Sequence, residues 1–283
     1  AALLPLHLWL PRAYSGTAPA VAALFAIMTK VGAYAIIRTG PLIFAGAAGR
    51  YMIPAALGTM ILGFAGFLAA RHLRVMTAFG LIGSTAILLV AVAVFQETAM
   101  AAALYYLPHT TLAAAFLFLV TDLLIRWRGT EGDAIVVTSG YAGQQVLAAL
   151  FFAGGIALAG LPPLSGFIGK LLILQAALSS SWWPAIWAVI LITSLVAVIG
   201  FARAGSTLFW KSGGDAPVSP GARAAPALPL KEAAPAGFLL ALMVLLTVAA
   251  GPVTAYVEAA SHQIFDVADY ARAVLPPASG AGS

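Results

Sequence analysis

The chain has 283 residues, of which 62% are hydrophobic and only 8% are charged, and its mean hydropathy is +1.01. Soluble domains carry about 25% charged residues, so this composition indicates a protein that lies largely in lipid. The lack of cysteine excludes disulfides and zinc–thiolate sites. The net charge of +5 comes without a basic run interleaved with aromatic residues, so we expect no nucleic-acid partner.

Apolar runs long enough to cross a bilayer follow one another along the chain. A Pro-rich piece at residues 1–17, predicted as the end of a broken helix and a loop, precedes a transmembrane bundle over residues 18–257. About seven spans are expected there, at residues 18–39, 52–70, 75–95, 99–125, 145–178, 184–210 and 234–257. The sequence therefore predicts an all-α, polytopic transmembrane helix bundle.

The tail after the last predicted span is less apolar. Residues 258–275 have apolar side chains at helical spacing against polar ones, which predicts an amphipathic helix at the membrane surface. Residues 276–283 have the small, polar composition of a disordered tail.

The basic residues of the predicted loops are unevenly divided between the two sides of the membrane. One side receives Arg12, Arg71, Arg74, Arg126, Arg128, Lys211, Arg223 and Lys231, and the other receives Arg38, Arg50 and Arg272. Because cytoplasmic loops carry the excess of Lys and Arg, the first side is predicted to be cytoplasmic. We therefore expect a multi-pass protein of the inner, or plasma, membrane of the cell.

Three ionisable side chains lie far from the ends of their predicted spans: Lys30, His109 and Lys170. A charge at that depth costs about 2.5–3.5 kcal/mol on insertion scales, so each must face a polar or hydrated interior or release its proton. The pattern favours a proton pathway through the three residues. The alternative is structural: lysines permanently paired with carboxylates, and a histidine that only hydrogen-bonds a neighbour.

The segment LPPLSGFIGK interrupts the fifth span directly before Lys170. Pro162 and Pro163 have no N–H, so carbonyl groups one turn earlier lose their helical partners, which lipid tolerates only where protein or water replaces them. Gly166 and Gly169 add flexibility and allow close approach. The break therefore predicts a discontinuous helix with a polar pocket at membrane depth beside the lysine, as in transporters.

Other polar side chains are weaker candidates for lining a pathway or cavity. For His7 the alternative is an interfacial histidine, and for Arg203 a side chain that reaches the headgroups. These candidates are His7, Tyr34, Thr110, Thr111, Ser165 and Arg203. With nine acidic residues, most of them in loops, and no G-x-S-x-G, H-E-x-x-H or Walker A pattern, we predict no catalytic residues, no metal site and no cofactor.

Three segments resemble the antiporter-like membrane subunits of respiratory complex I and of Mrp-type cation/proton antiporters. They are PLHLWLPRAYSGTAPAVAALFAIMTKVGAYAIIR (5–38), ALYYLPHTTLAAAFLFLVTDL (103–123) and LPPLSGFIGKLLILQAAL (161–178). The lysine in SGFIGKLLILQA looks most like that of the D-type subunits of Mrp or Pha antiporters. With the helix spacing between the segments, the resemblance covers residues 1–257.

The resemblance implies two inverted five-helix repeats joined by a hydrated axis, with this chain holding the second repeat and a C-terminal helix. Lys30, His109 and Lys170 match the lysine–histidine–lysine series of that axis. A glutamate and a further lysine of the pathway are expected upstream of Ala1. Some relatives have a lysine at the position of Ala113, so the pathway is expected to be sparser here.

The function implied by the resemblance is proton translocation within a multi-subunit Na⁺/H⁺ or K⁺/H⁺ antiporter. Its partners would be other membrane subunits, protons, Na⁺ or K⁺ and the lipid bilayer, and it would be a secondary transporter rather than an enzyme. Two alternatives stay open: a proton-pumping subunit of complex I or of a membrane hydrogenase, and a membrane scaffold with no conducting role. Neighbouring genes would distinguish the first alternative from an antiporter. Transport measured after the lysines are neutralised would distinguish the second.

Overall fold

The computed structural model describes residues 3–44, 49–138, 140–141, 143–211, 230–266 and 272, and these residues form helices joined by short connections. The long elements are α1 (Trp9–Ser15), α2 (Pro19–Phe44), α3 (Gly49–Ala69), α4 (Leu73–Ala93), α5 (Glu97–Arg128), α6 (Gln144–Ala159), α7 (Ser165–Ala177), α8 (Trp183–Gly205), α9 (Leu230–Val248) and α10 (Ala250–Phe265). A 3₁₀ turn, η1 (Gly129–Glu131), follows α5, and a π-helical turn, η2 (Ser206–Trp210), follows α8. The predicted all-α class is confirmed.

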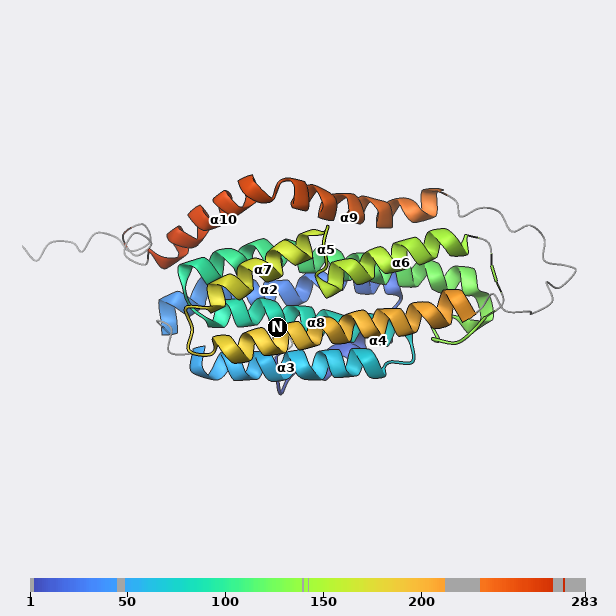
Figure 1. Ribbon diagram of the computed structural model, residues 1–283, viewed down its shortest axis with the longest axis horizontal. Coiled ribbons are helices and arrows are strands. Elements are labelled where there is room, and N and C mark those ends of the chain that lie inside the picture. The colour runs from blue at the N-terminus through green and yellow to red at the C-terminus, as the bar shows by residue number, and fades with distance from the viewer. Residues whose placement is uncertain are drawn as a thin grey trace, which may run out of the picture.

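The helices lie roughly along one common axis, and α9 and α10 run along one side of the bundle (Figure 1). Within the described residues, six helices are long and apolar enough to cross a membrane: α2, α3, α4, α5, α8 and α9. Helices α6 and α7 are apolar but shorter than a span. The chain thus has the architecture of a polytopic membrane bundle.

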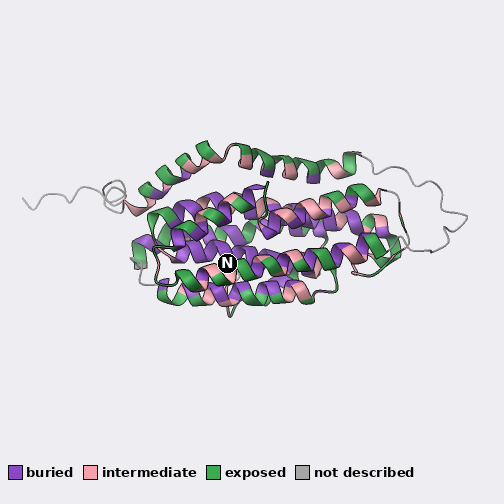
Figure 2. Ribbon diagram, viewed as in Figure 1, coloured by how far each residue is buried: buried purple, intermediate pink, exposed green. Residues whose placement is uncertain are grey.

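Helix α4 is the centre of the bundle. It contacts α1, α2, α3, α5, α7 and α8, and its most apolar 18-residue window is 89% buried. Gly63 of α3 and Gly83 of α4 make a close approach, because a Cβ atom added to Gly63 would lie 2.8 Å from the Gly83 backbone nitrogen. Buried residues concentrate in this central region, whereas α9 and α10 are mostly exposed or half-buried (Figure 2). Buried polar groups of α4 therefore face other helices rather than lipid.

The predicted interruption of residues 145–178 is present as two half-helices, α6 and α7, which confirms the Pro-broken helix. Gly160 ends α6 in the left-handed conformation, with φ of +71°, which glycine adopts without a steric penalty. Residues 160–164 then connect the half-helices before Ser165 begins α7. The break thus leaves the backbone end of α6 inside the bundle.

The C-terminal region divides at a different place from the predicted boundary after residue 257. Helix α9 ends at Val248 and α10 begins at Ala250. Pro252 explains the division, because it has no N–H to bond the Val248 carbonyl four residues earlier. The predicted surface helix over 258–275 is described only to residue 266 and at 272, and the predicted tail 276–283 lies outside the described residues.

Candidate functional site

The Lys170 site is built by the proline break. In a continuous helix the carbonyls of Leu158 and Ala159 would accept hydrogen bonds from residues 162 and 163, but both of these are proline. Instead, Lys170 Nζ donates to the Leu158 oxygen at 3.3 Å and to the Ala159 oxygen at 2.7 Å. The lysine side chain therefore occupies the place of the two missing backbone N–H groups.

A third acceptor completes the surroundings of Lys170. Its Nζ also donates to Ser194 Oγ of α8 at 2.9 Å, and only 5% of the residue is exposed. An ammonium group has three N–H donors, so these three acceptors match it. Gly160 makes the site possible, because a Cβ atom there would lie 2.6 Å from Lys170 Cδ. The site can therefore hold a positive charge without a carboxylate.

His109 of α5 is fixed by the same break. Its Nε2 lies 3.2 Å from the Ala157 oxygen of α6, and its Nδ1 lies 2.9 Å from Ser165 Oγ, at the start of α7. A carbonyl oxygen can only accept, so Nε2 carries the hydrogen, and in a neutral ring Nδ1 accepts from the serine hydroxyl. A Cβ atom on Gly166 would lie 2.5 Å from His109 Nε2, so this position needs glycine.

Lys30 of α2 has a sparser environment. It is 2% exposed, and its Nζ donates to Thr85 Oγ1 of α4 at 2.9 Å. Thr85 itself donates to the Leu81 oxygen at 2.8 Å. Within the residues that the structure describes, neither Lys30 nor Lys170 has a carboxylate oxygen within 4.0 Å of its nitrogen. The alternative of lysines held in permanent ion pairs thus finds no partner there.

Buried hydroxyl groups lie between Lys30 and His109. Thr110, which follows His109 in α5, donates to Ser84 Oγ of α4 at 2.9 Å, and Ser84 precedes Thr85. Ser84 and Thr85 both donate to the Leu81 oxygen. The two contacts between helices thus connect α2 to α4 and α4 to α5, through neighbouring residues in each helix.

The structure does not bring every candidate to the cluster formed by Lys30, His109, Lys170 and the hydroxyl groups that contact them. Tyr34 is 54% exposed on α2, and Arg203 is exposed and donates to the Ala70 oxygen at 2.9 Å. Thr111 donates to the Leu107 oxygen of its own helix. His7 is buried, but its Nδ1 has no hydrogen-bond partner among the described residues. Thr110 and Ser165 are the two weaker candidates that contact the cluster.

Sequence reasoning missed Ser84, Thr85 and Ser194. Hydroxyl residues in apolar helices usually bond a carbonyl of their own helix, so nothing in the sequence separates the ones that reach across. Their signal is only that they are polar residues in the runs LIGSTAILLV and ILITSLVAV. Which helix each one faces depends on packing that the span pattern does not determine.

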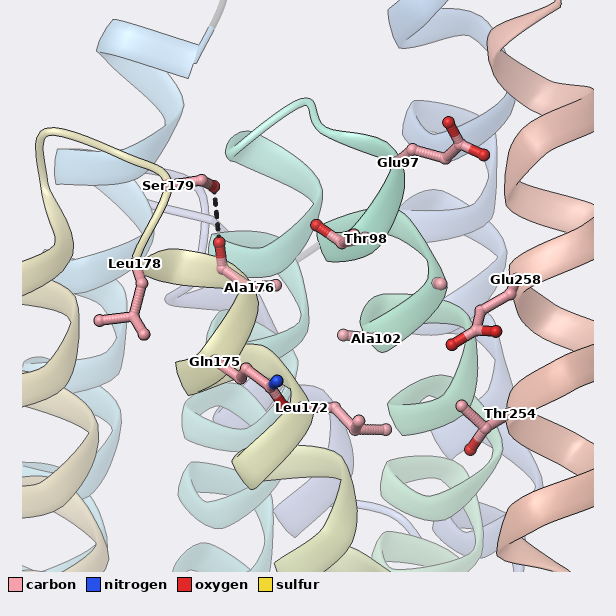
Figure 3. A pocket seen from close by; sticks show the side chains of 11 residues that line it. Glu97, Thr98, Ala102, Leu172, Gln175, Ala176, Leu178, Ser179, Thr254 and Glu258 are labelled. Atoms are coloured by element: carbon pink, nitrogen blue, oxygen red, sulfur yellow. Dashed lines mark hydrogen bonds between the residues drawn. The ribbon is translucent and has the colours of Figure 1, made fainter.

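A separate pocket of about 850 Å³ lies between the start of α5, the end of α7 and α10. Figure 3 shows Glu97 of α5 and Glu258 of α10 at this pocket, with Thr254 below Glu258 and Gln175 on α7. None of Lys30, His109 and Lys170 lines it. The described part of the chain holds no group of three His, Asp or Glu side chains that could bind a metal ion.

Outside the membrane-spanning segments, the loop after α5 is fixed to the start of α4. Asp133 accepts a hydrogen bond from Arg74 Nε at 3.0 Å and pairs with His72 Nδ1 at 3.3 Å. Burial acts to raise the pKa of Asp133, but the hydrogen bonds and charges of Arg74 and His72 outweigh it and hold the pKa below its ordinary value. This ion pair lies at the end of the bundle predicted to be cytoplasmic.

Comparisons with known proteins identify the family of this chain. The family model for the transmembrane part of NADH:quinone oxidoreductase and Mrp antiporters matches residues 1–197. The D-type subunit of a probable K⁺/H⁺ antiporter of Rhizobium meliloti is 30% identical, over 97% of this chain and 56% of the relative. The D-type subunit of the Na⁺/H⁺ antiporter of Bacillus subtilis is 33% identical, over 96% of this chain and 55% of the relative.

A solved structure shows the same fold. A chain of the Mrp complex from Dietzia sp. superposes with a TM-score of 0.80 at 26% sequence identity, covering 97% of this chain and 59% of that chain. The chain therefore spans a little over half the length of these three proteins. This multi-pass membrane protein belongs to the family of antiporter-like subunits found in NADH:quinone oxidoreductase and Mrp antiporters.

Proposed function

We propose that this chain carries part of the proton pathway of a subunit of a multi-subunit monovalent cation/proton antiporter in the cell membrane. The carrying observation is that Lys30, His109 and Lys170 are buried without carboxylate partners among the described residues and are bound instead by hydroxyl groups and by the carbonyls of a broken helix. Permanently charged structural lysines at this depth are usually paired with a carboxylate. Groups that gain and release protons need reversible partners, which hydroxyl groups provide.

The proposed pathway runs across the bundle from Lys30 to Lys170. Thr85, Ser84 and Thr110 provide hydroxyl groups between Lys30 and His109, with water completing the gaps between them. His109 takes a proton at Nδ1 when Ser165 turns its hydroxyl hydrogen away. Two positive charges in a poorly solvated interior repel each other strongly, so a proton arriving at one basic group drives release from the next.

The rest of the transporter is also part of the proposal. Because the relatives are nearly twice as long, the complete pathway and the exchange of Na⁺ or K⁺ involve further residues and further membrane subunits. The curated relatives, named as D-type antiporter subunits, support a secondary transporter over an enzyme.

The second candidate function is a proton-pumping subunit of complex I or of a membrane hydrogenase. The family description includes NADH:quinone oxidoreductase, and the same three basic residues would serve there. The 30–33% identity to D-type antiporter subunits favours the antiporter. Neighbouring genes separate the two: small antiporter subunits support the first, and quinone and iron–sulfur subunits the second.

The test uses the full-length protein within its complete complex, in inverted membrane vesicles. Antiport is measured as dissipation of the pH gradient when Na⁺ or K⁺ is added. We expect Lys170→Ala to abolish this signal in an assembled complex, because the variant has no group to protonate. Lys170→Arg should also be inactive, because a guanidinium does not release its proton. Lys231→Ala, at an exposed lysine near the start of α9, is the matched control.

The scaffold alternative makes the opposite prediction. If Lys170→Ala and Lys170→Arg both exchange cations at the rate of the parent, the lysine is structural and the proposed pathway is wrong. A loss confined to the two Lys170 variants supports proton conduction through the break.

A further inference from the structure

We infer that Ser194 is the positioning residue that lets Lys170 change its protonation state: it accepts a hydrogen bond from the ammonium form and donates one to the amine form. This inference rests on the proposed function, since it describes how one station of that pathway works. It concerns α8, a helix on which the sequence analysis placed no pathway residue besides Arg203.

The three partners of Lys170 differ in what they can donate. The oxygens of Leu158 and Ala159 are carbonyl groups and can only accept, whereas Ser194 carries a hydroxyl hydrogen. An ammonium group satisfies all three acceptors. An amine has two N–H groups and one lone pair, so it satisfies both carbonyls only if the third partner turns from acceptor to donor. Ser194 is the one partner of the three that can do so.

The hydroxyl hydrogen of Ser194 is also free to turn. Other buried hydroxyl groups are engaged with their own helices: Thr193 donates to the Val189 oxygen at 2.6 Å and Thr85 to the Leu81 oxygen at 2.8 Å. Among the described residues, Ser194 Oγ has no such bond to its own helix, and its contact is with Lys170 Nζ. Reversal at Ser194 therefore breaks no other hydrogen bond.

Lys170 releases its proton to the water of the proposed pathway. A water molecule of the pathway replaces Ser194 as the acceptor of the third N–H group. That N–H bond breaks as the proton passes to the water, which becomes hydronium. The nitrogen keeps the electron pair, its two remaining N–H groups stay on the carbonyls of Leu158 and Ala159, and Ser194 rotates to donate to the new lone pair. Reprotonation reverses each change, so both charge states of Lys170 are fully hydrogen-bonded.

Three substitutions of Ser194 test this, measured in the full-length subunit within the complete complex. Ser194→Thr keeps a rotating hydroxyl and should keep the maximal antiport rate within about twofold. Ser194→Ala removes the donor and should lower the maximal rate about tenfold, with an unchanged apparent affinity for the cation. Ser194→Asp offers an acceptor without a donor and should hold Lys170 charged, which abolishes antiport while the complex still assembles.

Thr193→Ala is the matched control, because its hydroxyl group is buried on the same helix but bonds only its own backbone. A merely structural Ser194 predicts that Ser194→Asp transports normally, since an ion pair would strengthen the contact. Normal antiport in Ser194→Asp or in Ser194→Ala overturns the inference. If Ser194→Asp does not assemble, the rates of Ser194→Ala and its rescue by Ser194→Thr decide.

The Lys170 variants separate this inference from the proposed function. If Lys170→Ala abolishes antiport while Ser194→Ala is normal, the pathway stands and the role of Ser194 is wrong. If Lys170→Ala itself is normal, the proposed function has failed.

Discussion

Lys30 and Lys170 are similarly deep in the protein, at 2% and 5% exposure, but their surroundings are built in different ways. Lys170 has three acceptors, two of which exist because a helix is broken. Lys30 lies in a helix without an interruption beside it and has, in the part of the chain that the structure describes, one hydroxyl partner, Thr85. The first site is completed by backbone, and the second by a single side chain.

The difference indicates how a membrane protein can hold a lysine without a carboxylate. Orphan carbonyls at the end of a half-helix provide fixed negative dipoles, which suit an ammonium group. Among the described residues, Thr85 leaves two N–H donors of a Lys30 ammonium without an acceptor, so Lys30 needs water for its charged form. We therefore expect Lys170 to tolerate the loss of a neighbouring hydroxyl group better than the loss of its carbonyls.

The largest loss of antiport is expected when the broken helix beside Lys170 is made continuous. The double variant Pro162→Ala/Pro163→Ala restores the two N–H groups that compete for the Leu158 and Ala159 oxygens. Losing two hydrogen bonds from a charged group, at about 1.5–3 kcal/mol each, should lower antiport by about a hundredfold or more. Antiport in inverted vesicles measures the effect, and Pro54→Ala, at an exposed proline inside α3, is the control. Parental rates in the double variant would show that the break is dispensable.

A smaller loss is expected from crowding His109. In Gly166→Ala the new Cβ atom would lie 2.5 Å from His109 Nε2 and 2.6 Å from the Ala157 oxygen, so the ring or the half-helix must move. Overpacking of this kind costs about 1–3 kcal/mol, so antiport should fall by about five- to 150-fold. Gly237→Ala should have no effect, because nothing lies within 4 Å of its added carbon. The contact would be unimportant if both variants matched the parent.

The variant Thr85→Val tests the hydrogen bond at Lys30, because it removes the hydroxyl partner of the lysine with little change in volume. One hydrogen bond to a charged group is lost, so antiport should fall by about tenfold. Thr77→Val is the control, since Thr77 is a buried residue of α4 that pairs with Thr121 instead. Equal rates for the two valine variants would mean that water, and not Thr85, serves Lys30.

The smallest effect is expected outside the membrane, at the ion pair of Asp133 with Arg74 and His72. Because the pKa of Asp133 is held below its ordinary value, the pair stabilises the fold above about pH 4, and this stabilisation is lost as the pH falls through the lowered pKa. Asp133→Asn should cost at most about 1 kcal/mol near neutral pH, and antiport should be unchanged. Thermal unfolding of the purified complex from about pH 3 to about pH 7 measures the difference between variant and parent. A large loss of antiport would place this loop in the transport mechanism.

Much of the fold follows from the sequence because lipid imposes simple requirements. A span needs about 20 apolar residues, and a proline pair removes two N–H groups wherever it occurs. Pro162 and Pro163 therefore predicted both the discontinuous helix and the unsatisfied carbonyls beside Lys170. The cost of charge at membrane depth singled out Lys30 and His109 in the same way.

The contacts between helices did not follow from the sequence. The spans are apolar on nearly every face, so their rotation is set by packing, such as the close approach of Gly63 to Gly83. Thr85 and Ser194 were missed for this reason, and Tyr34, expected to line the pathway, is on the exposed side of α2. The end of α9 at Val248 depended on one proline, Pro252, inside a run that reads as continuous.

The near-complete enclosure of α4 has a consequence for how the protein is made. With a mean hydropathy of 2.2 over its most apolar window, α4 can enter the bilayer by itself as it is synthesised, surrounded at first by lipid. Its neighbours α5, α7 and α8 come later in the chain. Lipid must therefore leave the surface of α4 as each later helix arrives, and the hydroxyl group of Ser84 lacks its partner Thr110 on α5 until that exchange occurs.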